Sequence, residues 1–582
     1  MRMTERSWPL LIVAVMLVVF FPAFFGEICN IDDAGMVEPL RQIAQWRLYD
    51  VFFPNVSGGL YYRPLLGLSF LVNKTLFNLS PFALHTENVL YHLANTLLVY
   101  FLIRLLLTLK GGTTHPGYAF VGSLLFGLHP IVTESVNWIS GRTDLLMGFF
   151  LLLSTLFLVR YRISGRKALP WLAALSFLCA LLCKELAIAF LPGFFLILYT
   201  KTQEQGDPAD SASSRRKKLL LIAGVTLLVI GSFFLLRTVA FSSNSSRIGL
   251  TLQYMQINPE HSFFLFLRAI GFYLKKLLIP WPLNFAIVEV DPLYDLAAIP
   301  LIGICMYIAL KGTLTSALFI TGLFLFSPAL LIALNQIAWT PYAERYLYST
   351  TAFFSIAIIL WYTHSSWPRM KKWGHLFCVG FLMAAALTTM QRNFTWQKNQ
   401  RILADSAEKS PLFSNIQWLY GANLYEQGDY ENALKYSQRA VNLPGSPLFL
   451  NPLREITLGY IYLRLDRVAE AIAVFETVIK KTKDKIPEAH EGLIDCYGRL
   501  WEQAVDQKQK QAYLDAMLSH GNSLFALRPD PLIYYNLGKK AMAGKAFEQA
   551  GMLFNKAVSN MQEGHEYLPF ARKLAQAFYK SN

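Results

Sequence analysis

Charged residues are scarce in this chain, and their scarcity limits the class of protein it can be. Only 16% of the 582 residues are charged, whereas about a quarter are charged in ordinary soluble domains. Apolar residues make up 54% of the sequence. This composition excludes a disordered chain and an ordinary cytosolic enzyme, and it points to a protein with a large membrane-embedded part.

Cysteine is also scarce and follows no recognisable pattern. Two of the six cysteines, Cys29 and Cys496, are isolated, and no CxxC or Cys/His spacing suggests a zinc site. The other four lie in apolar runs, where a thiol usually acts as a small hydrophobic side chain: Cys179, Cys183, Cys305 and Cys378. The sequence therefore predicts neither a disulfide framework nor a bound metal.

An acidic excess is missing too, because the net charge is +15. Residues 1–400 carry 31 basic and 18 acidic residues, whereas residues 401–582 carry 22 and 20. The basic excess thus lies in the apolar part of the chain, where it reflects membrane topology. We predict contacts with membrane lipids and no nucleic-acid partner.

Long apolar runs are abundant. If the N-terminus lies inside, the inner connecting segments carry 17 basic and four acidic residues, and the rest of residues 1–400 is neutral. Since inner segments of membrane proteins are rich in Lys and Arg, we expect the C-terminal part outside, in the periplasm or the ER lumen. The eleven candidate spans are approximately 7–26, 88–108, 118–136, 143–160, 169–184, 186–200, 218–236, 294–311, 313–333, 346–363 and 373–390.

Two outer segments, 27–87 and 237–293, are too long to be simple connectors. The second contains a basic amphipathic stretch, 261–282, with three cations among aromatic and aliphatic residues: Arg268, Lys275 and Lys276. A helix of this kind fits the membrane surface, and a twelfth span is the alternative. The three cations fit either a specific site or contacts of long side chains with lipid phosphates.

After residue 392 the pattern changes to soluble helices with a period of about 34–38 residues. Small or aromatic residues follow Gly421 at offsets of 12 and 19, Gly459 at offsets of 12 and 16, and Gly538 at offsets of 12, 16 and 19. This spacing is typical of tetratricopeptide repeats, in which small residues let paired helices approach and an aromatic ring fills the gap. We predict a membrane domain over 1–392 and a repeat solenoid over 393–582, with a generic helical bundle as the alternative to the solenoid.

Polar groups near membrane depth mark candidate functional sites because they are costly there. The adjacent carboxylates Asp32 and Asp33 follow the first span, and their repulsion can raise one pKa, as a general base requires. A solvated loop or a helix N-cap is the alternative. A hairpin between two spans is rich in ionisable and polar groups, with helix caps and an interfacial Trp as its alternative: His129, Glu134, Asn137, Arg142 and Asp144.

Two further clusters lie at span ends. Lys184 and Glu185 join two apolar runs, and adjacent residues of a helix point apart, so the two need not pair with each other. A structural turn is the alternative. Glu344 and Arg345 lie among tyrosines at the outer edge of a span, where an arginine can hold a phosphate through two hydrogen bonds. Interfacial anchoring is the alternative here.

The run Leu-His-Pro-Ile-Val-Thr-Glu-Ser-Val-Asn-Trp-Ile-Ser-Gly-Arg-Thr-Asp-Leu-Leu at 128–146 closely resembles a motif of the TMTC (transmembrane and tetratricopeptide-repeat-containing) proteins. The pairs 32–33, 184–185 and 344–345, together with Tyr348 and the C-terminal repeats, resemble that family in order and spacing. The resemblance covers nearly the whole chain. With about four recognisable repeats, where the animal members carry longer arrays, the chain looks like a compact bacterial relative.

The resemblance implies a GT-C fold and an inverting glycosyltransferase that uses a polyprenyl-phosphate sugar, typically mannose, to modify Ser or Thr of outer proteins. It implies Asp32 or Asp33 as the base, with Asp32 favoured as the first acid of the pair. It implies no metal or cofactor, and repeats that present the acceptor protein. Cations for the donor phosphate would be Arg345, Lys184, Arg142 and Lys275. The remaining pocket residues would be His129, Glu134, Asn137, Asp144, Glu185 and Glu344.

Two functions of other classes stay open at this point. One is a non-enzymatic membrane-anchored scaffold whose repeats assemble envelope proteins, although a scaffold has no use for the acidic pair and the matching cations. The other is a lipid flippase or transporter, which would be expected to show internal repeats among its spans and polar residues at the midplane. The sequence shows neither feature.

Overall fold

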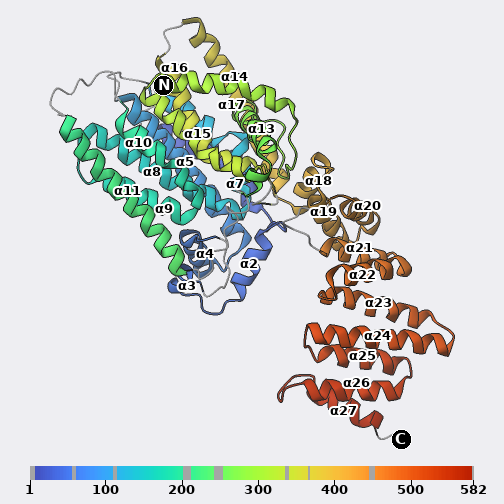
Figure 1. Cartoon of the computed structure of the whole chain (residues 1–582). Coiled ribbons are helices and arrows are strands. Elements are labelled where there is room, and N and C mark those ends of the chain that lie inside the picture. Colours follow the sequence, from blue (N-terminus) through green and yellow to red (C-terminus); the bar gives the residue numbers. More distant parts are fainter. Residues whose placement is uncertain are drawn as a thin grey trace. The chain divides into compact units, whose positions relative to one another are not determined.

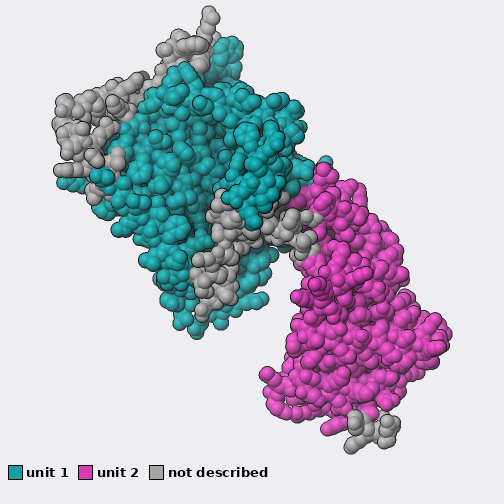
Figure 2. Space-filling view, in the orientation of Figure 1, with its two compact units in different colours: residues 1–410 teal, residues 411–582 magenta. Residues whose placement is uncertain are grey.

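The computed structural model of the chain describes residues 7–54, 61–108, 115–200, 212–240, 253–334, 338, 340–364, 368–444 and 452–579. It divides into two compact units, Met1–Ser410 and Pro411–Asn582 (Figure 1 and Figure 2). Among the described residues, the only strand-type pairing is an isolated bridge between Ile287 and Tyr342. The prediction of an all-α chain is confirmed.

The first unit is built from apolar helices. Its helices are α1 (Ser7–Val19), α2 (Asp33–Gln42), α3 (Leu48–Phe52), α4 (Pro64–Phe77), α5 (Pro81–Thr108), α6 (Gly117–Gly127), α7 (Thr133–Asn137), α8 (Arg142–Ser164), α9 (Leu169–Cys183), α10 (Leu191–Tyr199), α11 (Ala212–Ala240), α13 (Pro259–Leu278), α14 (Leu293–Leu310), α15 (Leu314–Ile332), α16 (Tyr348–His364), α17 (Pro368–Trp396) and α18 (Asn399–Lys409). Short 3-10 helices join them: η1 (Phe21–Phe25), η2 (Pro130–Val132), η3 (Ile139–Gly141), η4 (Glu185–Phe190) and η5 (Glu344–Leu347).

The eleven expected apolar runs all form helices. Seven helical segments within the described residues are long and apolar enough to cross a membrane, and a pair bent by 48°, Gly117–Gly127 with Pro130–Asn137, makes an eighth. The other three runs form shorter apolar helices, Ser7–Val19, Leu169–Cys183 and Glu185–Tyr199. The chain is therefore a multi-pass membrane protein, as its composition indicates.

Small residues let the helices of the first unit approach closely. At Gly193 of α10, a Cβ atom would lie 2.4 Å from the Thr321 side chain of α15. At Gly148 of α8, a Cβ atom would lie 2.9 Å from the ring of Tyr348 in α16. Close contact through small residues is typical of helices in lipid, where burial of apolar surface does not drive association. These contacts fix the ends of α8 and α16, which carry candidate site residues.

The described parts of the two long outer segments contain several helices. The first forms α2, α3 and α4, and the short apolar helix α4 is an element that the sequence reading did not predict. In the second, α13 covers most of the amphipathic stretch and buries Tyr273 and Lys276 while exposing Phe263. Although α13 has 20 residues, it is not among the helices apolar enough to cross a membrane. Its composition therefore favours the surface interpretation over a twelfth span.

The boundary between the two units lies after Ser410, not after residue 392 as expected. The pattern turns polar earlier because α17 continues to Trp396 and α18 packs back on the first unit. Lys409 Nζ in α18 donates to Leu283 O at 2.9 Å, and Asn399 N donates to the carboxylate of Glu27 at 3.0 Å. The polar helix α18 thus belongs to the first unit.

The second unit consists of antiparallel helix pairs. At Gly459 a Cβ atom would lie 2.6 Å from the Phe475 ring, and at Gly538 it would lie 2.9 Å from the Phe554 ring. These are the tight contacts that the repeat spacing predicts, and the repeat architecture is confirmed. The helices are α19 (Ser414–Glu426), α20 (Tyr430–Asn442), α21 (Leu453–Arg464), α22 (Val468–Thr482), α23 (Pro487–Gln503), α24 (Gln507–Leu527), α25 (Leu532–Ala543), α26 (Phe547–Asn560) and α27 (Leu568–Tyr579).

Candidate active site

Asp33 is a buried anchor at the start of α2. Its Oδ1 accepts hydrogen bonds from Ser140 N at 2.8 Å and from Ser140 Oγ at 2.6 Å, and its Oδ2 accepts one from Ile139 N at 3.1 Å. Burial raises the pKa of Asp33 to about 7, although these hydrogen bonds oppose the rise. Asp33 therefore ties α2 to the hairpin formed by η2, α7 and η3.

Asp32 has the opposite environment. Its side chain reaches solvent, and it makes no capping hydrogen bond although it occupies the N-cap position of α2. Desolvation by surrounding protein atoms raises the pKa of Asp32, and the positive charge of Arg345 opposes that rise. Asp32 thus occupies the N-cap position without a side-chain capping bond, and its exposed carboxylate interacts electrostatically with the buried cation Arg345.

Arg345 lies at the start of η5, buried against the hairpin. Its Nη1 donates to Glu134 Oε1 at 2.5 Å, and its backbone N donates to Glu134 Oε2 at 3.1 Å. The guanidinium carbon lies 4.7 Å from the ring centroid of Trp138 and 4.9 Å from that of Tyr346. A planar guanidinium between two aromatic faces is a fixed cation, which differs from a side chain that anchors at the interface.

Lys184 and Glu185 point apart, as expected. Because α9 ends at Cys183 and Lys184 is extended, the Lys184 ammonium turns toward α8 and pairs with Asp144 Oδ1 at 2.6 Å. The Glu185 carboxylate instead pairs with the Arg63 guanidinium at 3.0 Å and accepts from Tyr62 N at 3.2 Å. The buried pairs Lys184–Asp144 and Arg345–Glu134 form a cation–carboxylate cluster. The segment at 184–185 connects this cluster to the first outer segment.

In α13, Lys276 reaches the cluster, whereas the prediction names the neighbouring Lys275. Lys275 donates to the backbone oxygen of Trp281, and its predicted phosphate contact stays a prediction. The neighbouring Lys276 is buried and pairs with Glu344 Oε1 at 2.6 Å. The same Glu344 atom accepts from Asn284 N at 3.0 Å. Adjacent residues of a helix point in different directions, and the sequence alone does not show which one faces inward.

The predicted phosphate contact of Arg142 does not fit the structure. Its side chain is 0% exposed, and it lies over the ring of Phe70 at 4.6 Å. Its N–H groups are already used by acceptors of the protein: Asn88 Oδ1 at 2.8 Å, Ser69 Oγ at 3.2 Å, Leu84 O at 2.9 Å and Glu87 Oε2 at 2.6 Å. Arg142 therefore holds the first turn of α8 against α4 and α5 and has no surface for a ligand.

His129 and Asn137 position the hairpin. His129 Nε2 lies 3.3 Å from Leu277 O of α13, and its Nδ1 accepts from Ile131 N at 3.4 Å. Asn137 Nδ2 donates to Asn393 Oδ1 of α17 at 2.7 Å. Both side chains are buried, so they attach the hairpin to neighbouring helices and do not line an open pocket.

The sequence reading missed several residues of the cluster. Trp138 and Tyr346, which flank Arg345, each lie within a motif that was singled out, and the pairing of arginine with aromatic rings could have identified them. Arg63 and Lys276 are different, because nothing local indicates their partners: Arg63 and Glu185 are 122 residues apart, and Lys276 and Glu344 are 68 apart.

An apolar groove lies next to this cluster. Its volume is about 350 Å³, and side chains of α13, α14 and α15 line it, among them Leu274, Met306 and Phe326. Tyr273 connects the groove to the cluster, since its ring lies 6.0 Å from that of Phe326 and its hydroxyl accepts from Ala343 N at 3.3 Å. Within the described ranges, no group of three or more His, Cys, Asp and Glu is placed to hold a metal ion.

Comparison with known proteins supports the reading of both units. A family model for the tetratricopeptide repeat matches residues 456–480. The mouse protein O-mannosyl-transferase TMTC4 is 24% identical over 502 residues, which cover 74% of this chain and 66% of that protein. The Drosophila melanogaster protein O-mannosyl-transferase Tmtc3 is 24% identical over 518 residues, covering 74% and 53%. The chain thus spans somewhat less than two thirds of the length of the relatives it matches.

A shorter region is more similar. The mouse protein O-mannosyl-transferase TMTC1 is 36% identical over 137 residues, which cover 22% of this chain and 14% of that protein. A solved structure, a thermophilic TPR protein of Thermus thermophilus, is 21% identical and covers 29% of this chain and 82% of its own, with a TM-score of 0.22. The resemblance to the TMTC proteins that the sequence motifs indicate is confirmed by relatives that align over most of the chain.

Proposed function

We propose that this TMTC-like chain is an inverting membrane glycosyltransferase. It would move a sugar, with mannose favoured by the names of its relatives, from a polyprenyl phosphate to Ser or Thr hydroxyls of a protein. The observation that carries the proposal is the accessible Asp32 carboxylate near the fixed cation Arg345. A base that interacts electrostatically with a cation is what glycosyl transfer from a phosphate donor needs.

In the proposed reaction, the acceptor hydroxyl oxygen attacks the anomeric carbon of the donor. The bond between that carbon and the phosphate oxygen breaks, and the electron pair leaves with the polyprenyl phosphate. Asp32 takes the hydroxyl proton, and its raised pKa makes it a stronger base than an ordinary aspartate. Asp33 holds α2 in place through Ser140 and does not touch the reacting atoms.

Arg345 and Lys184 are the cations proposed for the departing phosphate. Each already pairs with a carboxylate, Glu134 and Asp144 respectively, and these pairs fix the positions of the two cations. Each cation has further N–H groups beyond the one in its ion pair. The Lys184 ammonium and the Arg345 guanidinium both lie against the ring of Tyr346, at 5.6 and 4.9 Å from its centroid. We propose that a donor phosphate binds beside that ring.

The apolar groove between α13, α14 and α15 supports a lipid-linked donor. Almost all of its lining is apolar, and its lining residue Phe326 lies beside Tyr273, whose hydroxyl accepts from Ala343 N just before Arg345. A polyprenyl chain is apolar and would be buried there, while its phosphate stays near the cations. A nucleotide sugar has no apolar tail and would gain nothing from this groove.

The predicted orientation in the membrane puts the repeats and Asp32 on the same side. The excess of Lys and Arg in the segments predicted to lie inside favours an N-terminus on the cytoplasmic side and residue 400 outside, in the periplasm or the ER lumen. The repeats of the second unit would then meet secreted or envelope proteins on the same side as Asp32. Repeat solenoids commonly bind peptides or proteins in their concave groove, so the repeats are proposed to present the acceptor.

A donor competition assay with the purified chain in lipid nanodiscs tests the activity. Polyprenyl-phosphate mannose and GDP-mannose, each with labelled mannose, are offered with a mixture of Ser- and Thr-containing acceptor proteins. The proposal expects label on protein only from the lipid donor, with polyprenyl phosphate released in equal amount. Label transferred from GDP-mannose would contradict the lipid-donor assignment. If neither mannose donor nor the corresponding lipid-linked glucose and N-acetylglucosamine donors yields labelled protein, the scaffold function takes precedence.

A further inference from the structure

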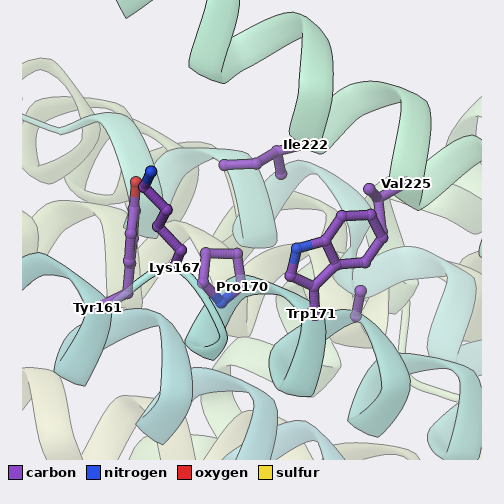
Figure 3. A pocket seen from close by; sticks show the side chains of 7 residues that line it. Tyr161, Lys167, Pro170, Trp171, Ile222 and Val225 are labelled. Atoms are coloured by element: carbon purple, nitrogen blue, oxygen red, sulfur yellow. The ribbon is translucent and has the colours of Figure 1, made fainter. Parts of the chain in front are cut away.

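A second cavity lies at the other end of the helices that carry the cluster. Its volume is about 220 Å³, and it is lined by Tyr161, Lys167, Pro170, Trp171, Ala174, Ile222 and Val225 (Figure 3). The lining comes from the end of α8, the connection to α9, the start of α9, and α11. Three helices therefore enclose one cavity, and nothing in the proposed reaction uses it.

The position of this cavity in the unit follows from the antiparallel pair α8 and α9. Helix α8 begins beside Asp144, in the candidate active site, and reaches Tyr161 after 17 residues, about 26 Å along its axis. Helix α9 begins at Leu169, beside the cavity, and ends just before Lys184 in the active site. The cavity and the candidate active site thus lie at opposite ends of the same two helices, near opposite membrane surfaces.

The cavity has one polar end and one apolar wall. The Tyr161 hydroxyl and the Lys167 ammonium lie together on one side, whereas Trp171, Ile222 and Val225 form the other side (Figure 3). Lys167 is exposed and has no ion-pair partner among the described residues. In the sequence, no acidic residue occurs between Asp144 and Glu185. The polar end is therefore suited to an anion.

We propose that this cavity binds an anionic phospholipid. The lipid phosphate would contact Lys167 and Tyr161, and the glycerol and the first acyl carbons would pack on Trp171 and Val225. Basic pockets between membrane helices on the cytoplasmic side bind anionic head groups, and Trp is enriched at the membrane interface, where Trp171 is 53% exposed. The proposal does not depend on the glycosyltransferase activity.

Lipid binding to the full chain tests the proposal. The detergent-solubilised protein is titrated with phosphatidylglycerol or phosphatidylcholine, and bound lipid is counted by native mass spectrometry. Lys167→Gln should weaken phosphatidylglycerol binding about fivefold, since one basic side chain near a membrane surface contributes about 1 kcal/mol. Arg166→Gln is the matched control, because Arg166 is exposed and does not line the cavity; its binding should stay at the wild-type value.

A cavity-filling variant tests the apolar wall separately from the charge. Val225→Phe should abolish phosphatidylglycerol binding at this site without changing the net charge. Equal losses in Lys167→Gln and Arg166→Gln would mean unspecific attraction to a basic surface and would overturn the proposal. Equal binding of phosphatidylcholine would overturn it as well. So would full competition by glycerol 3-phosphate alone, since that result would assign the cavity to small anions.

Discussion

At the scale of single residues, two neighbouring carboxylates have opposite surroundings. Asp33 is 0% exposed and accepts three hydrogen bonds from the hairpin, whereas Asp32 reaches solvent and makes no capping hydrogen bond. Both have a raised pKa because of desolvation, but only Asp32 can meet an acceptor hydroxyl. The adjacency of two acids is readable from the sequence, whereas the difference between them depends on Ser140, which lies 107 residues away.

Arg345 is the residue at which phosphate binding can be tested. Arg345→Lys should raise the KM for the lipid donor, because an ammonium makes a point contact where a guanidinium holds two oxygens. Arg345→Ala should reduce donor use further. It would also leave the buried Glu134 without its partner, which costs about 3–5 kcal/mol of stability. The lysine variant is therefore the cleaner test, measured by initial rates against donor concentration.

Arg41→Lys is a suitable control for that experiment, since Arg41 pairs with Glu38 in the same outer segment and lies outside the cation–carboxylate cluster. Its donor KM should equal that of the wild type. If Arg345→Lys and Arg345→Ala both turn over donor normally while remaining folded, Arg345 only braces Glu134 and the phosphate assignment fails.

At the scale of helices, the paired helices of each repeat pack closely because small residues lie at their contact. Ala433 in α20 is 0% exposed, and at Gly421 in α19 a Cβ atom would lie 2.5 Å from Ser437 Oγ of α20. Ala433→Arg should lower the free energy of unfolding of the isolated second unit by several kcal/mol, about 3 or more, because a charge would enter this contact. Urea unfolding followed by circular dichroism measures the change.

An arginine introduced at an exposed position of the same helix provides the control. Glu431→Arg should change the free energy of unfolding by no more than about 1 kcal/mol, mainly through its place in the first turn of α20. An Ala433→Arg domain as stable as the control would mean that α19 and α20 do not pack as the repeat spacing indicates.

A histidine pair makes the second unit sensitive to acid. His520 Nδ1 lies 3.1 Å from His490 Nδ1, and His490 Nε2 lies 2.6 Å from Asp484 Oδ1. Burial lowers the pKa of His520, and the neighbouring His490 lowers it further, while Asp484 opposes the shift. The unfolded chain then binds a proton that the folded unit does not, so this contribution to stability is complete above about pH 6.5 and declines below it.

We therefore expect the melting temperature of the isolated second unit to fall between pH 7 and pH 5. His520→Gln should make that fall smaller, whereas His565→Gln, at the other end of the unit, should leave it unchanged. Differential scanning calorimetry at several pH values measures both. An unchanged slope in His520→Gln would assign the acid sensitivity to other groups.

At the scale of the whole molecule, hydropathy and repeat spacing predicted the helical membrane unit and the repeat unit. Apolar runs must be long to cross a membrane, so the spans were visible in the sequence. The short helix α4 and the extent of the first unit were not predicted. The extent of that unit was missed because α18 is polar and is held by distant contacts such as that of Lys409 with Leu283. The cation–carboxylate pairs were missed for the same reason: Arg345 and Glu134 are 211 residues apart.

Topology can be tested independently of chemistry. An alkaline phosphatase fused after residue 400 should be active in a bacterial host, because the Lys- and Arg-rich segments predicted to lie inside favour an outside location for that position. A fusion after residue 210, in a basic inner segment, should be inactive. The reverse pattern of activity would invert the orientation and place Asp32 on the cytoplasmic side, away from secreted acceptors.

Asp32 is the residue proposed to act as the base of the glycosyl transfer. The most direct measurement is the transfer of labelled sugar from polyprenyl phosphate to protein by wild type, Asp32→Asn and Asp50→Asn, at equal folded protein. Base catalysis contributes roughly 100- to 10,000-fold, so Asp32→Asn should lose at least about 100-fold in rate while still binding donor. Asp50→Asn, in the same outer segment but paired with Arg47, should keep the wild-type rate. Wild-type transfer by Asp32→Asn would contradict the account.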